Sequence, residues 1–103
     1  MLDITDATAV ESAVRAAKPD AIVNCAAYTA VDRAESEAPQ AAAVNTTGAR
    51  NVAVAAAAAG APIIHVSTDY VFGGDGRLPY TPESPTSPLG VYGVTKLAGE
   101  TAV

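Results

Sequence analysis

The hydrophobic pattern of this chain alternates between helical spacing and short β-branched runs. Residues 7–18 carry apolar side chains on one face of a helix, which Thr5 or Asp6 can cap and which residues 18–20 end. Residues 21–27 form an apolar run that is typical of a buried strand. The first part of the chain therefore predicts a helix followed by a strand.

A second helix and a second strand follow. The helical stretch is predicted to break near Pro39, to continue over residues 40–59 and to end at Gly60, a residue suited to a left-handed helix cap. Residues 63–66 are mostly β-branched and lie after a proline, a pattern that is typical of a buried parallel strand.

Residues 73–88 are rich in glycine, proline and hydroxyl side chains, so they predict one long irregular loop. A helix around Tyr92 follows it. A domain linker is the alternative for this loop, but the order of the elements disfavours it. Helices that alternate with strands predict right-handed crossovers in a doubly wound parallel sheet, which is an α/β fold.

Composition narrows the classes of protein and partner. Half of the residues are apolar, and the net charge is −5 with only six basic side chains. These few basic residues argue against a nucleic-acid partner, whereas an anionic nucleotide could still bind to helix N-termini and backbone amides. No apolar run approaches the roughly 18 residues of a membrane span, and no signal-peptide pattern opens the chain. We expect a soluble, cytoplasmic protein with no membrane partner.

Several conspicuous residues have structural interpretations. The single Cys25 excludes an internal disulfide, and its position in an apolar strand favours inert packing over catalysis. His65 is expected to be a packed, hydrogen-bonded residue rather than a general base. Asp32, Glu35 and Glu37 are expected to be solvated acids at the start of a helix, without the additional ligands that a metal site needs.

The segment VYGVTK carries the first candidate chemistry. It places Tyr92 and Lys96 four residues apart, on one face of the predicted helix. An ammonium group beside a phenol favours the phenolate, so such a pair can move a proton to or from a substrate oxygen. The alternative is a surface helix that carries an amphipathic tyrosine and a solvated lysine.

Two hydroxyl residues add to this chemistry. Ser67 and Thr68 follow the second strand, at the end where open α/β sheets bind ligands, although such a pair is more often a turn or a helix cap. With Tyr92 and Lys96, Thr68 completes a set that could hold and protonate a carbonyl group during hydride transfer. The hydride itself must come from a cofactor.

Four sequence blocks carry a resemblance to a known family. They are VNCAAYTAVDRAE from Val23, AVNTTGARN ending at Asn51, STDYVFGG from Ser67 and PLGVYGVTKLAGE from Pro88. The chain resembles the extended short-chain dehydrogenase/reductase family, and within it the dTDP-4-dehydrorhamnose reductases. The resemblance lies in the residues of these blocks, in their order and in their spacing. The resemblance covers essentially the whole chain and implies part of a Rossmann-like, doubly wound parallel sheet.

The resemblance also implies roles for individual residues. Tyr92 would be the catalytic acid, Lys96 would be its partner at the nicotinamide ribose, and both would border the cofactor. Thr68 would hydrogen-bond the substrate keto oxygen, and Asn45 would support the lysine through water. The remaining implied ligand-binding residues are Asp69 and Tyr70 for the substrate, and Asp3, Ile4, Ala26, Ala27, Tyr28 and Thr29 for the cofactor.

The implied reaction is the reduction of dTDP-4-dehydro-6-deoxy-L-mannose to dTDP-L-rhamnose, a sugar donor for cell-envelope polysaccharide, with NADPH or NADH. Two alternatives stay open, namely an epimerase or dehydratase of the extended family that acts on another nucleotide sugar, and a non-catalytic regulatory subunit on the same fold. The resemblance allows a homodimer. It also allows Mg²⁺ in the full-length family, although no residues of this segment indicate a magnesium site.

The chain departs from this family in what it lacks. No strand is followed by the glycine-rich turn that binds a dinucleotide pyrophosphate, and the glycines at 73, 74 and 76 lead into a proline-rich loop instead. The chain also ends before the C-terminal substrate-binding part would begin. We therefore expect residues 1–103 to be the central part of one NAD(P)-binding Rossmann-like domain, truncated at both ends and inactive in isolation.

Overall fold

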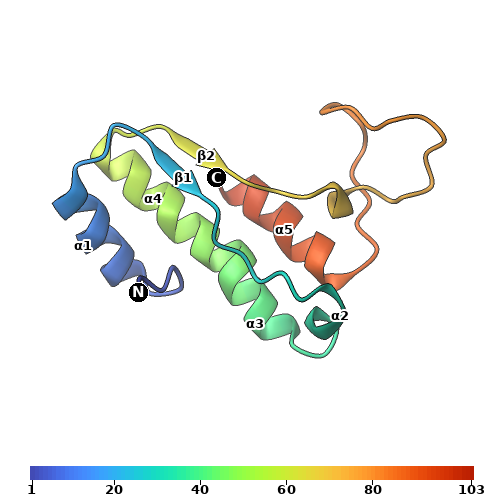
Figure 1. Cartoon of the computed structure of the whole chain (residues 1–103), viewed down its shortest axis with the longest axis horizontal. Helices are drawn as coiled ribbons and strands as arrows, with labels where there is room; N and C mark the ends of the chain where they lie inside the picture. Colours follow the sequence, from blue (N-terminus) through green and yellow to red (C-terminus); the bar gives the residue numbers. More distant parts are fainter.

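The computed structural model describes residues 1–103 and forms a two-stranded sheet with helices packed along one side of it (Figure 1). The helical elements are α1 (Ala7–Ala17), α2 (Val31–Ala34), α3 (Ala38–Ala42), the π-helical segment η1 (Ala43–Gly48), α4 (Ala49–Ala59), the 3-10 turn η2 (Asp69–Val71) and α5 (Val91–Ala102). The strands are β1 (Ile22–Asn24) and β2 (Ile63–His65). The predicted alternation of helices and strands is therefore confirmed.

The two strands pair in parallel, with Ile22 opposite Ile63. These two side chains pack against a small core formed by Val10 of α1 together with Val52 and Ala55 of α4. A parallel pair needs a long crossover, and the helical chain from α2 to α4 provides it. The core is built from small residues, as the alanine-rich helix segments suggest.

The opposite face of the sheet is exposed. Val23 and Ile64 are register partners and are 57% and 60% exposed, and Val66 is 50% exposed. The prediction of buried strands is therefore wrong for the side chains on this face. The reason is that α1 and α4 cover only the face that carries the core (Figure 1).

The helix ends follow the predicted signals. Asp6 caps α1, because its side-chain carboxylate accepts a hydrogen bond from the Ala9 amide at 3.0 Å. Lys18 ends α1 in the left-handed conformation at φ 47°, and Gly60 ends α4 at φ 67°. A left-handed residue satisfies the last carbonyls of a helix, and glycine adopts it without steric cost.

The structure places Cys25 just after a strand and Pro39 just inside the start of a helix. Cys25 is exposed because β1 already ends at Asn24, so its predicted packing inside a strand is wrong. Pro39 stands in the first turn of α3, where a missing amide hydrogen breaks no helical hydrogen bond. The helical stretch is interrupted at residues 35–37, close to Pro39 as predicted.

The predicted helix over residues 40–59 is confirmed in its extent, but it contains a π-helical turn. Elements α3, η1 and α4 follow one another without a gap from residue 38 to residue 59. The π-helical segment η1 places Asn45 in the interior, where it is 1% exposed. Hydrophobic spacing does not distinguish a π turn from an α turn, so the sequence pattern gives no sign of it.

The segment before α5 is irregular, as predicted. Residues 73–90 contain no helix or strand, and most of them are exposed. The loop is anchored at its base by the stacked rings of Phe72 and Tyr80, whose centroids are 4.6 Å apart. The Ser87 amide also donates to the Val71 carbonyl at 2.9 Å.

Helix α5 packs closely against η1 and η2. A Cβ atom added at Gly99 would overlap the carbonyl oxygen of Asn45, and one added at Gly93 would overlap the carbonyl oxygen of Tyr70. Backbone atoms cannot move aside as a flexible side chain can, so glycine permits this approach at both positions. None of the helices has both the length and the apolar character needed to span a membrane.

The Gly99→Ala substitution tests this packing. Alanine favours a helix by itself, but the overlap with the Asn45 carbonyl should lower the free energy of unfolding by about 1–3 kcal/mol. Thr101→Ala, at an exposed position of the same helix, should change it by less than about 0.5 kcal/mol. Denaturant unfolding of the natural polypeptide that carries this sequence measures both. Equal stability of the two variants would contradict the close contact.

Candidate functional site

The first two turns of α5 present the predicted tyrosine and lysine. Lys96 is only 2% exposed, and its ammonium group donates to the Val66 carbonyl at 2.6 Å. Burial lowers the pKa of Lys96, and the nearby carboxylate of Glu100 opposes this effect. The alternative of a solvated surface lysine is therefore wrong.

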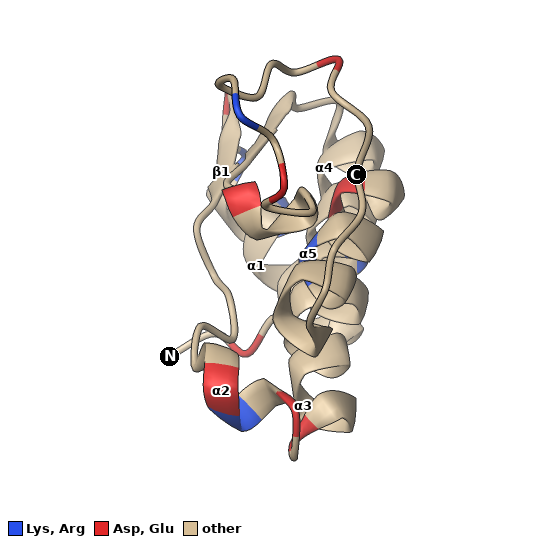
Figure 2. Cartoon of the chain, turned by 90° about the vertical axis from the view of Figure 1, so that its right-hand side faces the viewer, with Lys and Arg blue, Asp and Glu red and all other residues tan.

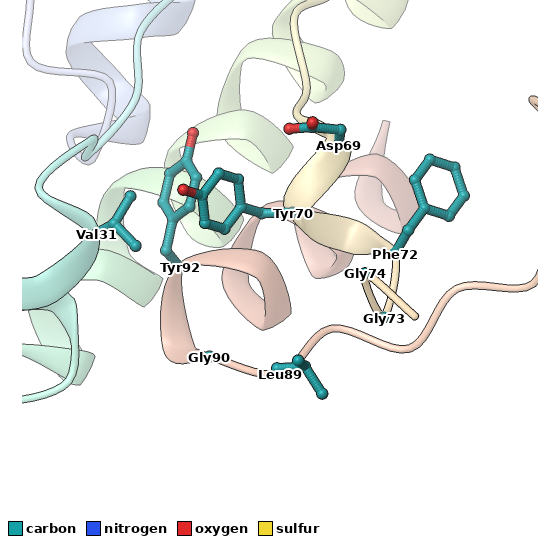
Figure 3. A pocket seen from close by; sticks show the side chains of 9 residues that line it. All are labelled: Val31, Asp69, Tyr70, Phe72, Gly73, Gly74, Leu89, Gly90 and Tyr92. Atoms are coloured by element: carbon teal, nitrogen blue, oxygen red, sulfur yellow. The ribbon is translucent and has the colours of Figure 1, made fainter. Parts of the chain in front are cut away.

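Tyr92 lies at the rim of a pocket. Its ring meets the ring of Tyr70 edge to face, with centroids 5.5 Å apart and an interplanar angle of 73°. Figure 3 shows the two phenols side by side, with Val31 of α2 facing Tyr92 and Asp69 on the adjacent turn. An edge-to-face pair of this kind restrains both rings, so the direction of the Tyr92 hydroxyl is partly set by Tyr70.

The pocket encloses about 430 Å³ and opens between α2, η2 and the start of α5. Its lining residues are Val31, Asp69, Tyr70, Phe72, Gly73, Gly74, Leu89, Gly90 and Tyr92. Three of the predicted site residues thus meet here, namely Asp69, Tyr70 and Tyr92. Sequence reasoning missed Val31, Phe72 and Leu89, which contribute apolar surface from three separate segments.

Thr68 lies beside this pocket and caps a turn. Its hydroxyl oxygen accepts a hydrogen bond from the Tyr70 amide at 3.2 Å. The cap that the sequence left open as an alternative is therefore present. The preceding Ser67 donates its hydroxyl to the carboxylate of Glu100 on α5. The end of β2 is thereby attached to the same helix that carries Tyr92 and Lys96.

A second hollow of about 510 Å³ lies at the carboxyl end of β1. It is lined by Met1, Leu2, Asp3, Ile4, Cys25, Ala26, Ala27 and Val44. Four of the residues predicted to border a cofactor, Asp3, Ile4, Ala26 and Ala27, are thus brought together. The amide and the hydroxyl of Thr5 donate to the Asp3 carboxylate at 2.9 and 2.8 Å, and they lower the pKa of Asp3.

The other four residues predicted to border the cofactor do not line this hollow, namely Tyr28, Thr29, Tyr92 and Lys96. Tyr28 is held at three points. Asn45 accepts from its amide at 2.8 Å and donates to its carbonyl at 3.1 Å, and the Tyr28 hydroxyl donates to Glu37 at 2.5 Å. The Glu37 carboxylate holds the phenolic proton and so raises the pKa of Tyr28.

Asn45 connects the Tyr28 segment directly to the helix α5. Besides its bonds to Tyr28, its amide group donates to the Thr95 hydroxyl at 3.1 Å, one residue before Lys96. A role for Asn45 through water remains a prediction, whereas the direct contacts run to Tyr28 and Thr95. Thr46 adds a further bond, from its hydroxyl to the Thr95 carbonyl at 3.0 Å.

Asp32 and Glu35 are exposed, as the sequence predicts, and Glu37 is half-buried, but two of these acids also make contacts that the sequence did not predict. Glu35 accepts a hydrogen bond from the Val91 amide at 2.8 Å, and Glu37 accepts one from Tyr28. Both contacts join residues that are far apart in sequence or in different segments, so the local pattern does not reveal them. Asp32 makes no such bond. No group of three or more histidine, cysteine or acidic residues is placed to hold a metal ion.

His65 is packed and hydrogen-bonded as predicted, but only through one ring nitrogen, because its buried Nε2 has no hydrogen-bond partner. It is partly buried, and its Nδ1 lies 3.1 Å from the side-chain amide nitrogen of Asn24. Burial lowers the pKa of His65, and the charge of Lys96 lowers it further, while Glu100 acts in the opposite direction.

Comparison with known proteins identifies the family. A family model described as the RmlD substrate binding domain matches residues 1–103. The chain belongs to this family. It is 57% identical over 102 residues to a dTDP-4-dehydrorhamnose reductase from Streptomyces griseus, and this match covers 99% of the chain and 34% of the relative.

Solved structures show the same fold. The crystal structure of a dTDP-4-dehydrorhamnose reductase from Bacillus anthracis in complex with NADP has a TM-score of 0.96 at 46% identity, over 98% of this chain and 36% of that one. A dTDP-glucose 4,6-dehydratase from Streptomyces venezuelae with NAD and TYD bound has a TM-score of 0.90 at 32% identity, over 98% and 31%. The predicted Rossmann-like α/β class is confirmed. The chain spans about a third of the length of these relatives.

The lowered pKa of His65 makes stability depend on pH. Between that pKa and the ordinary value of 6.5, the unfolded chain binds a proton that the folded chain excludes, so stability should fall as pH falls through this range. His65→Gln keeps a polar side chain but removes this titration. From pH 7 to pH 5, the wild type should therefore lose more unfolding free energy than the variant. Identical losses in urea titrations at the two pH values would contradict the prediction.

Proposed function

We propose that the natural polypeptide carrying this chain reduces the 4-keto group of dTDP-4-dehydro-6-deoxy-L-mannose and forms dTDP-L-rhamnose, with NADPH or NADH as the reductant. The observation that supports this best is the pair of Tyr92 at the pocket rim and the buried Lys96 one helical turn later. The family and the 57% identity to a named reductase support the choice of reaction.

In this proposal, the 430 Å³ pocket receives the keto-sugar. Tyr92 donates its phenolic proton to the carbonyl oxygen as that oxygen gains negative charge, and Thr68 hydrogen-bonds the same oxygen. Asp69 and Tyr70 lie beside the sugar. Lys96 provides a positive charge that stabilises the phenolate left on Tyr92, and its bond to Val66 keeps the ammonium in place.

The hollow at the end of β1 is proposed for the nicotinamide cofactor. Its alanines leave room for a planar ring, and its position at the carboxyl end of a parallel strand is where such sheets bind nucleotides. Asp3 and Ile4 would contact the adenine end, and Ala26 and Ala27 would border the bound molecule, with Tyr28 and Thr29 continuing that border. Tyr92 and Lys96 would approach its nicotinamide end. When bound, the cofactor supplies the hydride for the carbonyl carbon.

We also propose the domain to which the chain belongs, the use of the product, the cellular compartment and the assembly. Residues 1–103 would be the central part of one NAD(P)-binding Rossmann-like domain of the extended short-chain dehydrogenase/reductase type. The product would serve cell-envelope polysaccharide synthesis, and the enzyme would work in the cytoplasm, where we expect both nucleotide substrates. A homodimer is the proposed assembly.

A nucleotide-sugar dehydratase or epimerase is the second candidate, because the structure also matches a dTDP-glucose 4,6-dehydratase with a TM-score of 0.90. The two functions differ in cofactor balance. A reductase consumes one reduced cofactor for each sugar, whereas a dehydratase or epimerase regenerates its own. Stoichiometric loss of NADPH absorbance with the keto-sugar therefore favours the reductase, and sugar conversion without that loss favours the second candidate.

The Tyr92→Phe variant tests the proposed acid. Phenylalanine keeps the edge-to-face packing on Tyr70 but has no proton to donate, so kcat should fall by about 10²-fold or more while the Kd for NADPH changes less than about threefold. Tyr80→Phe is the matched control, since Tyr80 does not itself line the pocket and phenylalanine keeps its stacking on Phe72. Steady-state kinetics and cofactor titration measure both. Unchanged turnover in Tyr92→Phe would rule out the assigned role.

A further inference from the structure

The helix α5 begins without a cap from its own sequence. Gly90 occupies the N-cap position and has no side chain to offer, and the first turn carries no acidic residue. The cap comes from elsewhere in the chain, because the Val91 amide donates to the carboxylate of Glu35 at 2.8 Å. Glu35 lies at the end of α2, so the contact crosses 56 positions of sequence.

The lack of a side chain at Gly90 leaves room for the Glu35 carboxylate. A Cβ atom added there would lie 2.9 Å from the same Glu35 oxygen, closer than real Cβ atoms approach other atoms. Glycine at this position therefore admits the carboxylate to the helix end. A carboxylate at a helix N-terminus also interacts favourably with the helix dipole. The hydrogen bond, the missing side chain and the charge all agree with a cap supplied by Glu35.

The same acidic turn also contacts the segment after β1. Two residues after Glu35, the Glu37 carboxylate accepts the Tyr28 hydroxyl at 2.5 Å. Figure 2 shows acidic residues along α2 and the turn that leads to α3. The α2 helix itself contributes Val31, which faces Tyr92 across the pocket (Figure 3). The turn at residues 35–37 thus connects the helix that carries Tyr92 with the segment that precedes α2.

We propose that Glu35 is a positioning residue for Tyr92. The proposal rests on the proposed function, in which Tyr92 is the proton donor. Glu35 binds the amide of Val91, one residue before Tyr92, and so sets where the phenol lies relative to Val31 and to a bound carbonyl oxygen. Small displacements of a proton donor lower the rate of the chemical step more than they weaken substrate binding.

The experiment compares Glu35→Ala, Glu35→Gln and Asp32→Asn in the full-length natural polypeptide, with NADPH and the keto-sugar as substrates. Alanine removes the cap, so kcat should fall by about tenfold or more while KM for NADPH changes by less than about threefold. Glutamine keeps an acceptor oxygen and should restore most of kcat. Asp32→Asn, which removes an exposed charge from the same short helix, should match the wild type.

A second readout reports on the helix itself. Amide hydrogen exchange over residues 91–93 should become faster in Glu35→Ala and stay near the wild-type rate in Glu35→Gln and Asp32→Asn. Gly90→Ala provides a second variant, because its methyl group should displace the carboxylate without removing its charge. Since Gly90 also lines the pocket, the KM for the keto-sugar is measured with it and should stay within about threefold of the wild-type value. Gly90→Ala should reproduce the loss of kcat and the faster exchange. This variant also decides the question if Glu35→Ala does not fold.

The outcomes separate the two proposals. A kcat for Glu35→Ala and Gly90→Ala equal to that of Asp32→Asn would overturn the positioning role. So would a loss of kcat with unchanged exchange over residues 91–93, because the effect would then not pass through the helix end. If the wild type does not reduce the keto-sugar at all, the proposed function fails, and the positioning role for its proton donor is overturned with it. Faster exchange in Glu35→Ala would in that case still show that the cap itself is real.

Discussion

The close packing of α5 on the π-helical segment η1 determines where the site residues lie. At Gly99 no side chain separates the helix from the Asn45 carbonyl, and Thr95 is hydrogen-bonded to the Asn45 side chain one turn earlier. Because the contact is made by backbone atoms and a buried amide, it leaves little freedom for α5 to rotate or slide. The position of Lys96 follows from it, whereas Tyr92 lies on the first turn of α5, which Glu35 also contacts.

The same contact explains the setting of the lysine. Lys96 follows Thr95 and is itself buried, and its ammonium donates to the Val66 carbonyl beyond the end of β2. An ammonium buried with so few partners loses hydration, which lowers the pKa of Lys96. The Ser67 hydroxyl and the Glu100 carboxylate join the strand end to the helix on the next turn. The packing of α5 therefore also accounts for the lowered pKa of Lys96.

Features with a local cause could be predicted from the sequence. Asp6 caps the start of α1 and Gly60 ends α4 through interactions within a few residues. Helical spacing alone places Tyr92 and Lys96 on one face of α5. Features that depend on distant contacts could not be predicted in this way. The caps and bonds made by Glu35 and Glu37 involve other segments, so these residues looked like solvated acids in the sequence.

The residues that line the pocket also differ in whether the sequence could predict them. Asp69 and Tyr70 were expected from the block that carries them, whereas Val31 and Leu89 reach the pocket only because α2 and the loop before α5 fold toward η2. The exposed face of the sheet likewise does not follow from the strand pattern alone. An apolar strand pattern predicts which side chains favour burial, but it does not say whether an element covers both faces.

In the proposed function, this site directs a hydride to a carbonyl carbon and a proton to its oxygen. The most direct measurement uses the full-length natural polypeptide with dTDP-4-dehydro-6-deoxy-L-mannose and NADPH that carries deuterium at the transferable position, followed by mass spectrometry of the sugar product. We expect one deuterium at C4 of the product and one oxidised cofactor for each sugar converted. A product without deuterium, or conversion without net cofactor oxidation, would contradict it.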